Sequence, residues 1–283
     1  MFHPVIYLNE LSLYYDKFYF DIVQVGTGGN GGYLVQRLSK MLHSFSQTKK
    51  MNFTFSYTLI DGDKVEQKNL LRQPFITSDI DQPKAKILAE RYGQAYDIPI
   101  FYQTSYINNA DELKQAFQLP PDYSMALYIP ILIGCVDNNA TRQIMHLVFM
   151  DSKRMIYLDA GIDSVLFDKE GNVEIESGYS GQVVCGLRNK GKTILPPVGE
   201  VYPDILRDKD SRLPTEACGE TIINYPQRMQ TNEVAAIVLA GYLNTILGDY
   251  QIISHYTNFN ARTMLIKPTY IQKNNNNIRR STL

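Results

Sequence analysis

The 283-residue sequence contains no tryptophan, four histidines and only three cysteines. The cysteines, Cys135, Cys185 and Cys218, lie far apart, and none belongs to a Cys-x-x-Cys pair. A four-cysteine zinc site cannot be built from three cysteines, so no zinc is expected. A sparse, odd number of cysteines suits a reducing compartment better than a disulfide-stabilised fold. We therefore expect a cytoplasmic protein.

Strong net charge and long apolar runs are also lacking. With 28 Lys and Arg against 29 Asp and Glu, the formal net charge is -1, so no field attracts nucleic acid or an anionic membrane. No apolar stretch approaches the roughly 20 residues that span a bilayer. No basic segment followed by an apolar run, typical of a signal peptide, occurs near Met1. We expect neither nucleic acid nor membrane as a partner.

What the sequence does contain, up to about residue 160, is a regular alternation of two patterns. Runs rich in apolar, aromatic and β-branched residues predict strands, and helically spaced apolar residues predict the segments between them. This alternation predicts an α/β fold with a Rossmann-like, doubly wound and mainly parallel sheet. The predicted strands are 20–25, 53–60, 98–102, 128–135 and 155–159, and the predicted helices are 33–45, 84–96, 111–117 and 141–150.

The pattern weakens after residue 160. Residues 186–217 hold prolines, glycines and charges with little periodicity, which predicts a mobile crossover loop over about 186–230. We expect a single domain over residues 1–272, whose sheet is extended by antiparallel strands, and a disordered Asn-rich tail at 273–283. Short strands are predicted at 165–167, 173–175, 182–184, 252–256 and 263–266, and a helix at 232–247.

A glycine-rich loop, Gly26-Thr27-Gly28-Gly29-Asn30-Gly31, follows the first strand and opens the first helix. That is the context in which a G-x-G-x-x-G motif binds nucleotides. Glycines allow a tight turn and a close approach of phosphate, and the helix N-terminus offers unpaired N–H groups. The loop predicts a nucleotide site, with a tight turn that binds no ligand as the alternative.

Asp61 ends the second strand, where an acid often bonds a ribose hydroxyl. Dehydrogenases and adenylating enzymes share this feature, and a carboxylate that only caps a turn is the alternative. The following residues separate the classes, because Asn69, Arg72 and Lys84 are not needed by a dehydrogenase. An adenylating enzyme needs fixed cations. When a carboxylate attacks the α-phosphate of ATP, negative charge builds on the phosphate oxygens and on the departing pyrophosphate. Lys86 is the alternative to Lys84.

Asp137 follows the apolar strand 128–135, at the edge where α/β sheets bind ligands. Mg²⁺ is commonly held by one or two carboxylates and by substrate phosphates. Asp137 is therefore a candidate ligand for the Mg²⁺ of MgATP, although it could also cap the next helix. Asn138, Asn139 and Arg142 are further candidates for this edge.

Several motifs together carry a family resemblance through residues 20–160. The glycine loop, the segment Asp-x-Asp-x-Val-Glu-x-x-Asn-Leu-x-Arg-Gln at 61–73, the pair Lys84-Ala85 and the run 135–138 resemble the ThiF-type, ubiquitin-activating-enzyme superfamily. The resemblance implies an adenylyltransferase that uses ATP and Mg²⁺. It implies that Asp61 holds the ribose, that Asn69, Arg72, Gln73 and Lys84 contact phosphates, and that Asp137 serves the Mg²⁺. The complete predicted nucleotide-binding set is Gly26, Gly28, Gly29, Asn30, Gly31, Asp61, Asp63, Asn69, Arg72, Gln73, Lys84, Asp137 and Asn138.

Beyond residue 160, segments 180–184, 195–203 and 217–218 are similar to the ThiF-like group of PRTRC plasmid-type gene clusters. Members of that group are encoded near a small ubiquitin-like protein, which implies that a ubiquitin-like or sulfur-carrier-like C-terminal tail is the substrate. The resemblance also favours a homodimer. Cys218 resembles the crossover cysteine of sulfur-carrier-activating relatives, which implies a thioester step. A thiol that packs against the next helix is the alternative for Cys218, and Cys185 is predicted to lie in the core.

The predicted catalytic residues are thus Arg72, Lys84, Asp137 and Cys218. Two other functions remain open. An NAD- or FAD-binding oxidoreductase explains the glycines and Asp61 but leaves the cations unused. A non-catalytic protein that binds a ubiquitin-like partner is the other possibility, and the retained cations and Asp137 argue against it.

Overall fold

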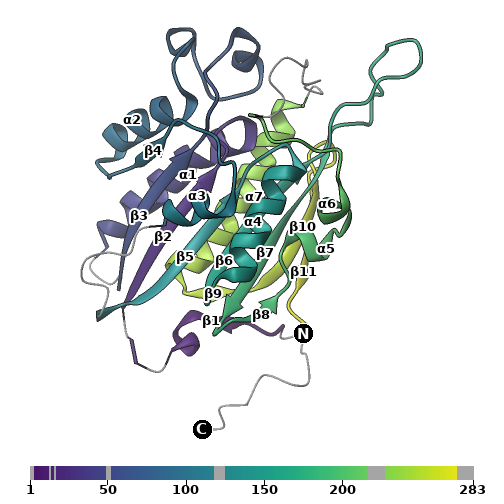
Figure 1. Ribbon diagram of the computed structural model, residues 1–283. Helices are drawn as coiled ribbons and strands as arrows, with labels where there is room; N and C mark the ends of the chain where they lie inside the picture. Colours follow the sequence, from purple (N-terminus) through teal and green to yellow (C-terminus); the bar gives the residue numbers. More distant parts are fainter. Residues whose placement is uncertain are drawn as a thin grey trace.

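The computed structural model describes residues 3–12, 14–15, 17–48, 52–117, 125–215 and 227–272. Its main feature is one large sheet with the strand order β11-β10-β7-β6-β5-β2-β3-β4, beside which β8 pairs with β7 (Figure 1). Strands β1 (Ile6–Tyr7) and β9 (Gln251–Ile252) form a separate small pair. Within the described ranges, no helix combines the length and hydropathy needed to cross a membrane.

Five strands form the parallel half of the sheet: β2 (Phe18–Val25), β3 (Phe53–Ile60), β4 (Phe101–Gln103), β5 (Leu127–Gly134) and β6 (Met155–Ile162). The chain winds from β2 outward through β3 to β4 and then crosses back, so that β5 pairs with the other edge of β2. The winding direction therefore reverses between β2 and β5. Such a switch point is where open α/β sheets bind ligands.

The remaining strands, β7 (Ser180–Asn189), β8 (Lys192–Leu195), β10 (Ser254–Asn260) and β11 (Leu265–Tyr270), are antiparallel to their neighbours. The prediction of a crossover loop from about residue 186 is wrong in its first part. Residues 186–195 belong to the β7–β8 hairpin, and α5 (Val198–Val201) and α6 (Asp204–Arg207) follow. Two ladder partners of β7, the strands β6 and β10, are distant in sequence, so local periodicity could not indicate them.

The strands predicted at 165–167 and 173–175 reduce to one isolated bridge between Phe167 and Val173. The later part of the predicted crossover, residues 216–226, lies outside the described residues, and so does the tail at 273–283.

Helices cover both faces of the sheet (Figure 1). On one face lie α1 (Gly29–Ser46), α2 (Lys84–Tyr96) and α7 (Met229–Gly248), and on the other lie α3 (Ala110–Gln115), α4 (Asn139–Asp151), α5 and α6. Strand residues alternate between the two cores: Ile22 packs with the first set of helices and Val23 with the second. This two-sided burial is expected for a parallel sheet, and it confirms the predicted doubly wound α/β fold with an antiparallel extension.

Candidate nucleotide-binding site

The glycine loop sits at the switch point, locked between its neighbouring strands. The Gly26 N–H donates to the Ile60 carbonyl at 2.9 Å, and the Cys135 N–H donates to the Val25 carbonyl at 2.9 Å. Gly26 has φ +92°, and a Cβ there would collide with the Cys135 carbonyl oxygen. Only glycine fits this position, because any other residue would be strained by the positive φ and its Cβ would also collide with the carbonyl oxygen. Helix α1 begins at Gly29, so its first N–H groups face the same edge.

Asp61 fastens this loop to the end of β3. One carboxylate oxygen accepts from the Thr27 N–H at 2.7 Å and from the Thr27 hydroxyl at 2.8 Å, and the other accepts from the Asp63 N–H at 2.9 Å. Burial raises the pKa of Asp61, while Lys84 opposes that rise. A carboxylate has about four lone-pair positions, so three accepted bonds leave room for one more donor. The turn-capping alternative is therefore observed, and it does not exclude a ribose contact.

Lys84 begins α2 with its side chain only 6% exposed, and its Nζ lies 2.7 Å from Asp63 Oδ2. The Tyr106 hydroxyl donates to the other oxygen of Asp63. Burial resists charge on Asp63, but Lys84 and Tyr106 outweigh it and lower the pKa of this carboxyl. Lys86, the sequence-based alternative, lies instead 3.9 Å from Glu90 on the helix surface. The lysine brought to the aspartates is Lys84.

The segment between β3 and α2 passes through two short 3-10 helices, Gln67–Leu71 and Thr77–Asp79. Asn69 is buried, and its Oδ1 accepts from the Glu66 N–H at 2.8 Å, so it shapes the segment. Gln73 is also buried and faces Gly28, and its Oε1 has no hydrogen-bond partner among the described residues. A buried acceptor left unpaired costs about 1–3 kcal/mol. This orphaned atom beside the glycine loop is consistent with a ligand that donates a hydrogen bond.

Arg72 follows at the end of the first 3-10 helix and is half-buried. Burial lowers the pKa of its guanidinium, while the negative charge of Asp137 opposes that change. An arginine stays charged despite such a shift, because its ordinary pKa lies far above neutral pH. Asp137 therefore lies close enough to Arg72 for its charge to act on the guanidinium.

Asp137 lies in the loop between β5 and α4 with an exposed side chain. The residue that caps α4 is Asn138, whose Oδ1 accepts from the Thr141 N–H at 2.8 Å, so the helix-cap alternative for Asp137 is wrong. Arg142 holds this loop by donating to the Val136 carbonyl at 2.6 Å while it pairs with buried Asp159 at 3.0 Å. Arg142 thus supports the loop, and the Asp137 carboxylate is not used by the cap.

The described residues contain no group of three or more His, Cys, Asp or Glu side chains that could hold a metal ion. A single carboxylate still fits Mg²⁺, because that ion is usually bound by one or two carboxylates together with substrate phosphates. Asp137 is thus suited to hold Mg²⁺ that arrives with a nucleotide.

The described cysteines are unsuited to nucleophilic chemistry. Cys185 is fully buried, and burial raises the pKa of its thiol to about 12. Burial also raises the pKa of Cys135, and the negative charge of Asp159 adds to the rise. Since the thiolate is the reactive form, both stay inert, and the predicted core placement of Cys185 is confirmed. Cys218, the predicted nucleophile, lies outside the described residues.

Sequence reasoning missed three residues of this edge: Thr27, Tyr106 and Asn232. Asn232, on α7, is fully buried, and a Cβ added to Gly29 would overlap its Oδ1. Its Nδ2 donates to the Arg228 carbonyl at 2.9 Å, and its Oδ1 lacks a hydrogen-bond partner in the described structure. Thr27 could have been noticed inside the glycine motif. Tyr106 and Asn232 come from remote segments, and no local pattern marks them.

A glycine loop at a switch point and a carboxylate after the next strand are the features with which doubly wound α/β proteins bind nucleotides. The chain belongs to the ThiF family, whose family model matches residues 20–280. This agrees with the resemblance carried by the sequence motifs. The comparison with curated proteins finds no match.

Solved structures with a similar fold include PaaA and E. coli MccB. PaaA is 16% identical with a TM-score of 0.55, over 90% of this chain and 64% of that chain. MccB with AMPCPP and selenomethionine MccA is 16% identical with a TM-score of 0.52, and the match covers 88% of this chain and 63% of the MccB chain. MccB with ATP is 16% identical with a TM-score of 0.52, over 93% and 66%. The chain thus spans under two thirds of the length of PaaA, and at this identity the likeness concerns the fold.

Proposed function

We propose that this protein uses ATP to adenylate the C-terminal carboxylate of a small ubiquitin-like or sulfur-carrier-like protein. One observation carries the proposal: the Asp61 carboxylate holds Thr27 of the glycine loop at the switch point, and Gln73, next to Arg72 in the chain, faces Gly28. Membership of the ThiF family supports it, and so do the MccB structures with ATP, AMPCPP and MccA. The similarity to PRTRC-type ThiF-like sequences supports a ubiquitin-like substrate.

In this reaction a carboxylate oxygen attacks the α-phosphorus of ATP. A carboxyl–phosphate anhydride bond forms, the α–β phosphoanhydride bond breaks, and pyrophosphate leaves with the electron pair. Lys84 is already paired with Asp63, so Arg72 is the better source of positive charge for the phosphate oxygens. The Lys84–Asp63–Tyr106 group would set the position of the segment after β3. Mg²⁺ held by Asp137 would neutralise further phosphate charge.

Further parts of the proposal rest on the family resemblance. Cys218 would accept the activated carboxyl group as a thioester, with release of AMP. Residues 1–272 would form one domain that works as a homodimer. A non-catalytic role is the second candidate, and the pairing of Lys84 with Asp63 favours it, because that pair reduces the positive charge available for catalysis.

The test is ATP–pyrophosphate exchange with a small ubiquitin-like protein of the kind encoded near PRTRC-type relatives, using wild type, Asp137→Ala and Cys218→Ala. Asp249→Ala serves as a matched control, since Asp249 is exposed at the far end of α7. We expect exchange that requires Asp137 and survives the loss of Cys218. A folded wild type that binds ATP but shows no exchange would favour the non-catalytic role.

A further inference from the structure

An arm leaves the sheet between β6 and β7, at residues 164–178, and projects from the body (Figure 1, teal-green, upper right). It is held together by its own hydrogen bonds. The Glu174 N–H donates to the Leu166 carbonyl at 2.9 Å, and the Asp168 N–H donates to the Asn172 carbonyl at 2.9 Å. The Asp168 carboxylate also accepts from the Glu170 N–H at 2.9 Å. The arm is therefore a shaped hairpin with a defined surface.

Part of that surface is apolar. Four large apolar residues of the arm are exposed to solvent, with exposed fractions of 52% for Leu166, 47% for Phe167, 46% for Val173 and 74% for Ile175. An isolated two-stranded hairpin is at best marginally stable in water. Clustered exposed apolar groups on a soluble protein mark interaction sites more often than they mark ordinary surface.

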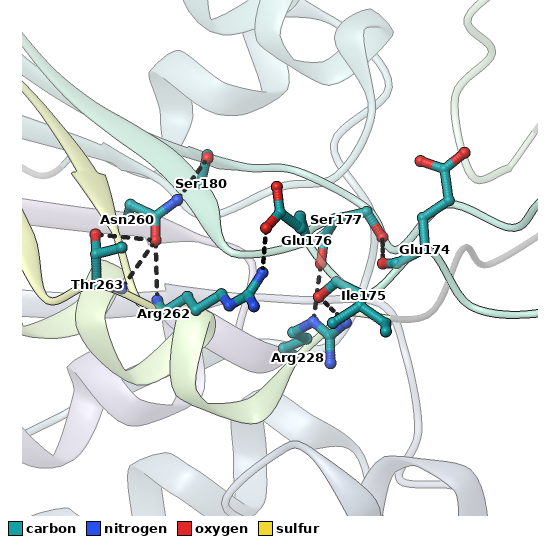
Figure 2. A network of polar contacts seen from close by, with 9 residues as sticks. All are labelled: Glu174, Ile175, Glu176, Ser177, Ser180, Arg228, Asn260, Arg262 and Thr263. Atoms are coloured by element: carbon teal, nitrogen blue, oxygen red, sulfur yellow. Dashed lines mark hydrogen bonds and ion pairs between the residues drawn. The ribbon is translucent and has the colours of Figure 1, made fainter.

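The base of the arm is fixed to the body by a polar network (Figure 2). Arg228 donates to the Ser177 carbonyl at 2.8 Å, and its guanidinium stacks over the Tyr179 ring at 4.0 Å from the centroid. On the other side, Arg262 lies 2.9 Å from the Glu176 carboxylate and joins the arm to the β10–β11 turn. These contacts fix the direction in which the arm projects.

The same base lies next to the candidate nucleotide site. Thr231 is buried in α7, and its hydroxyl donates to the Gly178 carbonyl at 2.7 Å. The next residue, Asn232, abuts Gly29 of the glycine loop. Consecutive residues of α7 therefore hold the arm and touch the loop. A macromolecule bound on the arm lies beside the site where its own tail would react.

The charge of the arm indicates which partner it fits. Residues 164–178 contain four acidic side chains, Asp168, Glu170, Glu174 and Glu176, against one basic side chain, Lys169. A two-fold dimer with the arm on the symmetry axis would bring the acidic surfaces of two arms together, which costs free energy. A basic partner with exposed apolar side chains complements the arm in both respects.

We propose that the arm is the docking surface for the folded body of the protein substrate, and that this body presents a basic and apolar face to it. The inference rests on the proposed function for the identity of the partner. The arm would raise the affinity for the whole substrate and leave the chemistry at the tail unchanged.

The first measurement is binding of a fluorescein-labelled ubiquitin-like protein of the kind encoded near PRTRC-type relatives, followed by fluorescence anisotropy with a non-hydrolysable ATP analogue present. The arm variants are Ile175→Asp and the double change Glu170→Lys with Glu174→Lys. The matched controls are Ile194→Asp in β8 and Glu10→Lys, both exposed and remote from the arm. We expect at least tenfold weaker binding for the arm variants, unchanged binding for the controls, and unchanged affinity for the ATP analogue in all.

The second measurement compares exchange supported by the whole ubiquitin-like protein with exchange supported by a peptide of its last six residues. The arm variants should raise KM for the protein about tenfold and leave kcat, and all constants for the peptide, unchanged. Binding without exchange in wild type would overturn the proposed function and keep the docking surface. A wild type that does not bind the labelled protein, or arm variants that bind it normally, would overturn the docking surface. Dissociation of a dimer by Ile175→Asp in sedimentation velocity would assign the arm to self-association instead.

Discussion

Polar side chains at the edge of the parallel half of the sheet differ in burial and bonding from those of the arm in the antiparallel half. In the parallel half, residues of the candidate site are bonded to one another, as Thr27 is to Asp61 and Lys84 to Asp63. In the antiparallel half, the polar groups of the arm are exposed, and the Glu176 side chain is 88% exposed in its pair with Arg262. The polar side chains of the candidate site are bonded to one another, whereas those of the arm face solvent.

This difference suits a division of the proposed activity, with the chemical step at the candidate site and recognition of the protein substrate at the arm. Chemistry at a phosphate requires donors placed to within a fraction of an ångström, which a buried network provides. Recognition of another protein requires exposed apolar area and complementary charge. Changes in the parallel half should therefore alter the reaction, and changes in the antiparallel half should alter binding or stability alone.

The largest effect is expected from Gly26→Ala. The positive φ would strain alanine by about 1–3 kcal/mol, and its Cβ would meet the Cys135 carbonyl. We expect loss of exchange and a lower Tm. The control Gly241→Ala, in α7 where no atom lies within 4 Å of the added Cβ, should be more stable by about 0.5–1 kcal/mol with normal exchange. Retained exchange in Gly26→Ala would remove the loop from the site.

Asp159→Ala acts at the boundary between the halves, since β6 pairs with both β5 and β7. It would leave the Arg142 charge buried without its partner, which costs about 3–5 kcal/mol. Because Arg142 also holds the Val136 carbonyl, exchange should fall together with the free energy of unfolding measured in urea. The control Asp204→Ala, whose side chain is 98% exposed, should leave both unchanged. An effect on stability alone would show that the Asp137 loop is held in another way.

Arg72→Ala should separate chemistry from stability. Removal of one donor to a developing negative charge typically costs about 10²–10³-fold in rate, and a half-buried surface residue contributes little to folding. We expect that loss in the exchange rate with an unchanged Tm. Arg207→Ala, with a side chain 77% exposed, is the matched control. A rate within a few-fold of wild type would mean that Arg72 is not the phosphate cation.

The smallest effect concerns His146, which packs against Gly199 in α5. Burial lowers the pKa of His146 below its ordinary value of 6.5, and Glu200 opposes that change. A lowered folded-state pKa means that the stabilising contribution is complete above pH 6.5 and is lost as pH falls through the folded value. The Tm should therefore fall slightly between pH 7 and pH 5, and His146→Gln should flatten that slope. An equal slope in the variant would assign the pH dependence to other groups.

The sequence was most informative where a pattern was local. Strand 53–60 and helix 84–96 are found with the predicted bounds, because alternating or helical periodicity ends at clear breaks, Asp61 and Pro83. Asp61 directly follows that strand, as predicted, and the structure adds its bonds to Thr27 of the glycine loop. The full length of β7 was missed, because its pairing with β6 and β10 depends on segments far along the chain. Tyr106 and Asn232 were missed for the same reason.

The contact between Gly29 and Asn232 carries an evolutionary consequence. A side chain larger than hydrogen at position 29 would occupy the space that the Asn232 amide fills. In diverging relatives, these two positions should therefore change together, with a bulkier residue at 29 accompanied by a smaller one at 232. Helix α7 and the glycine loop would then share one inherited constraint.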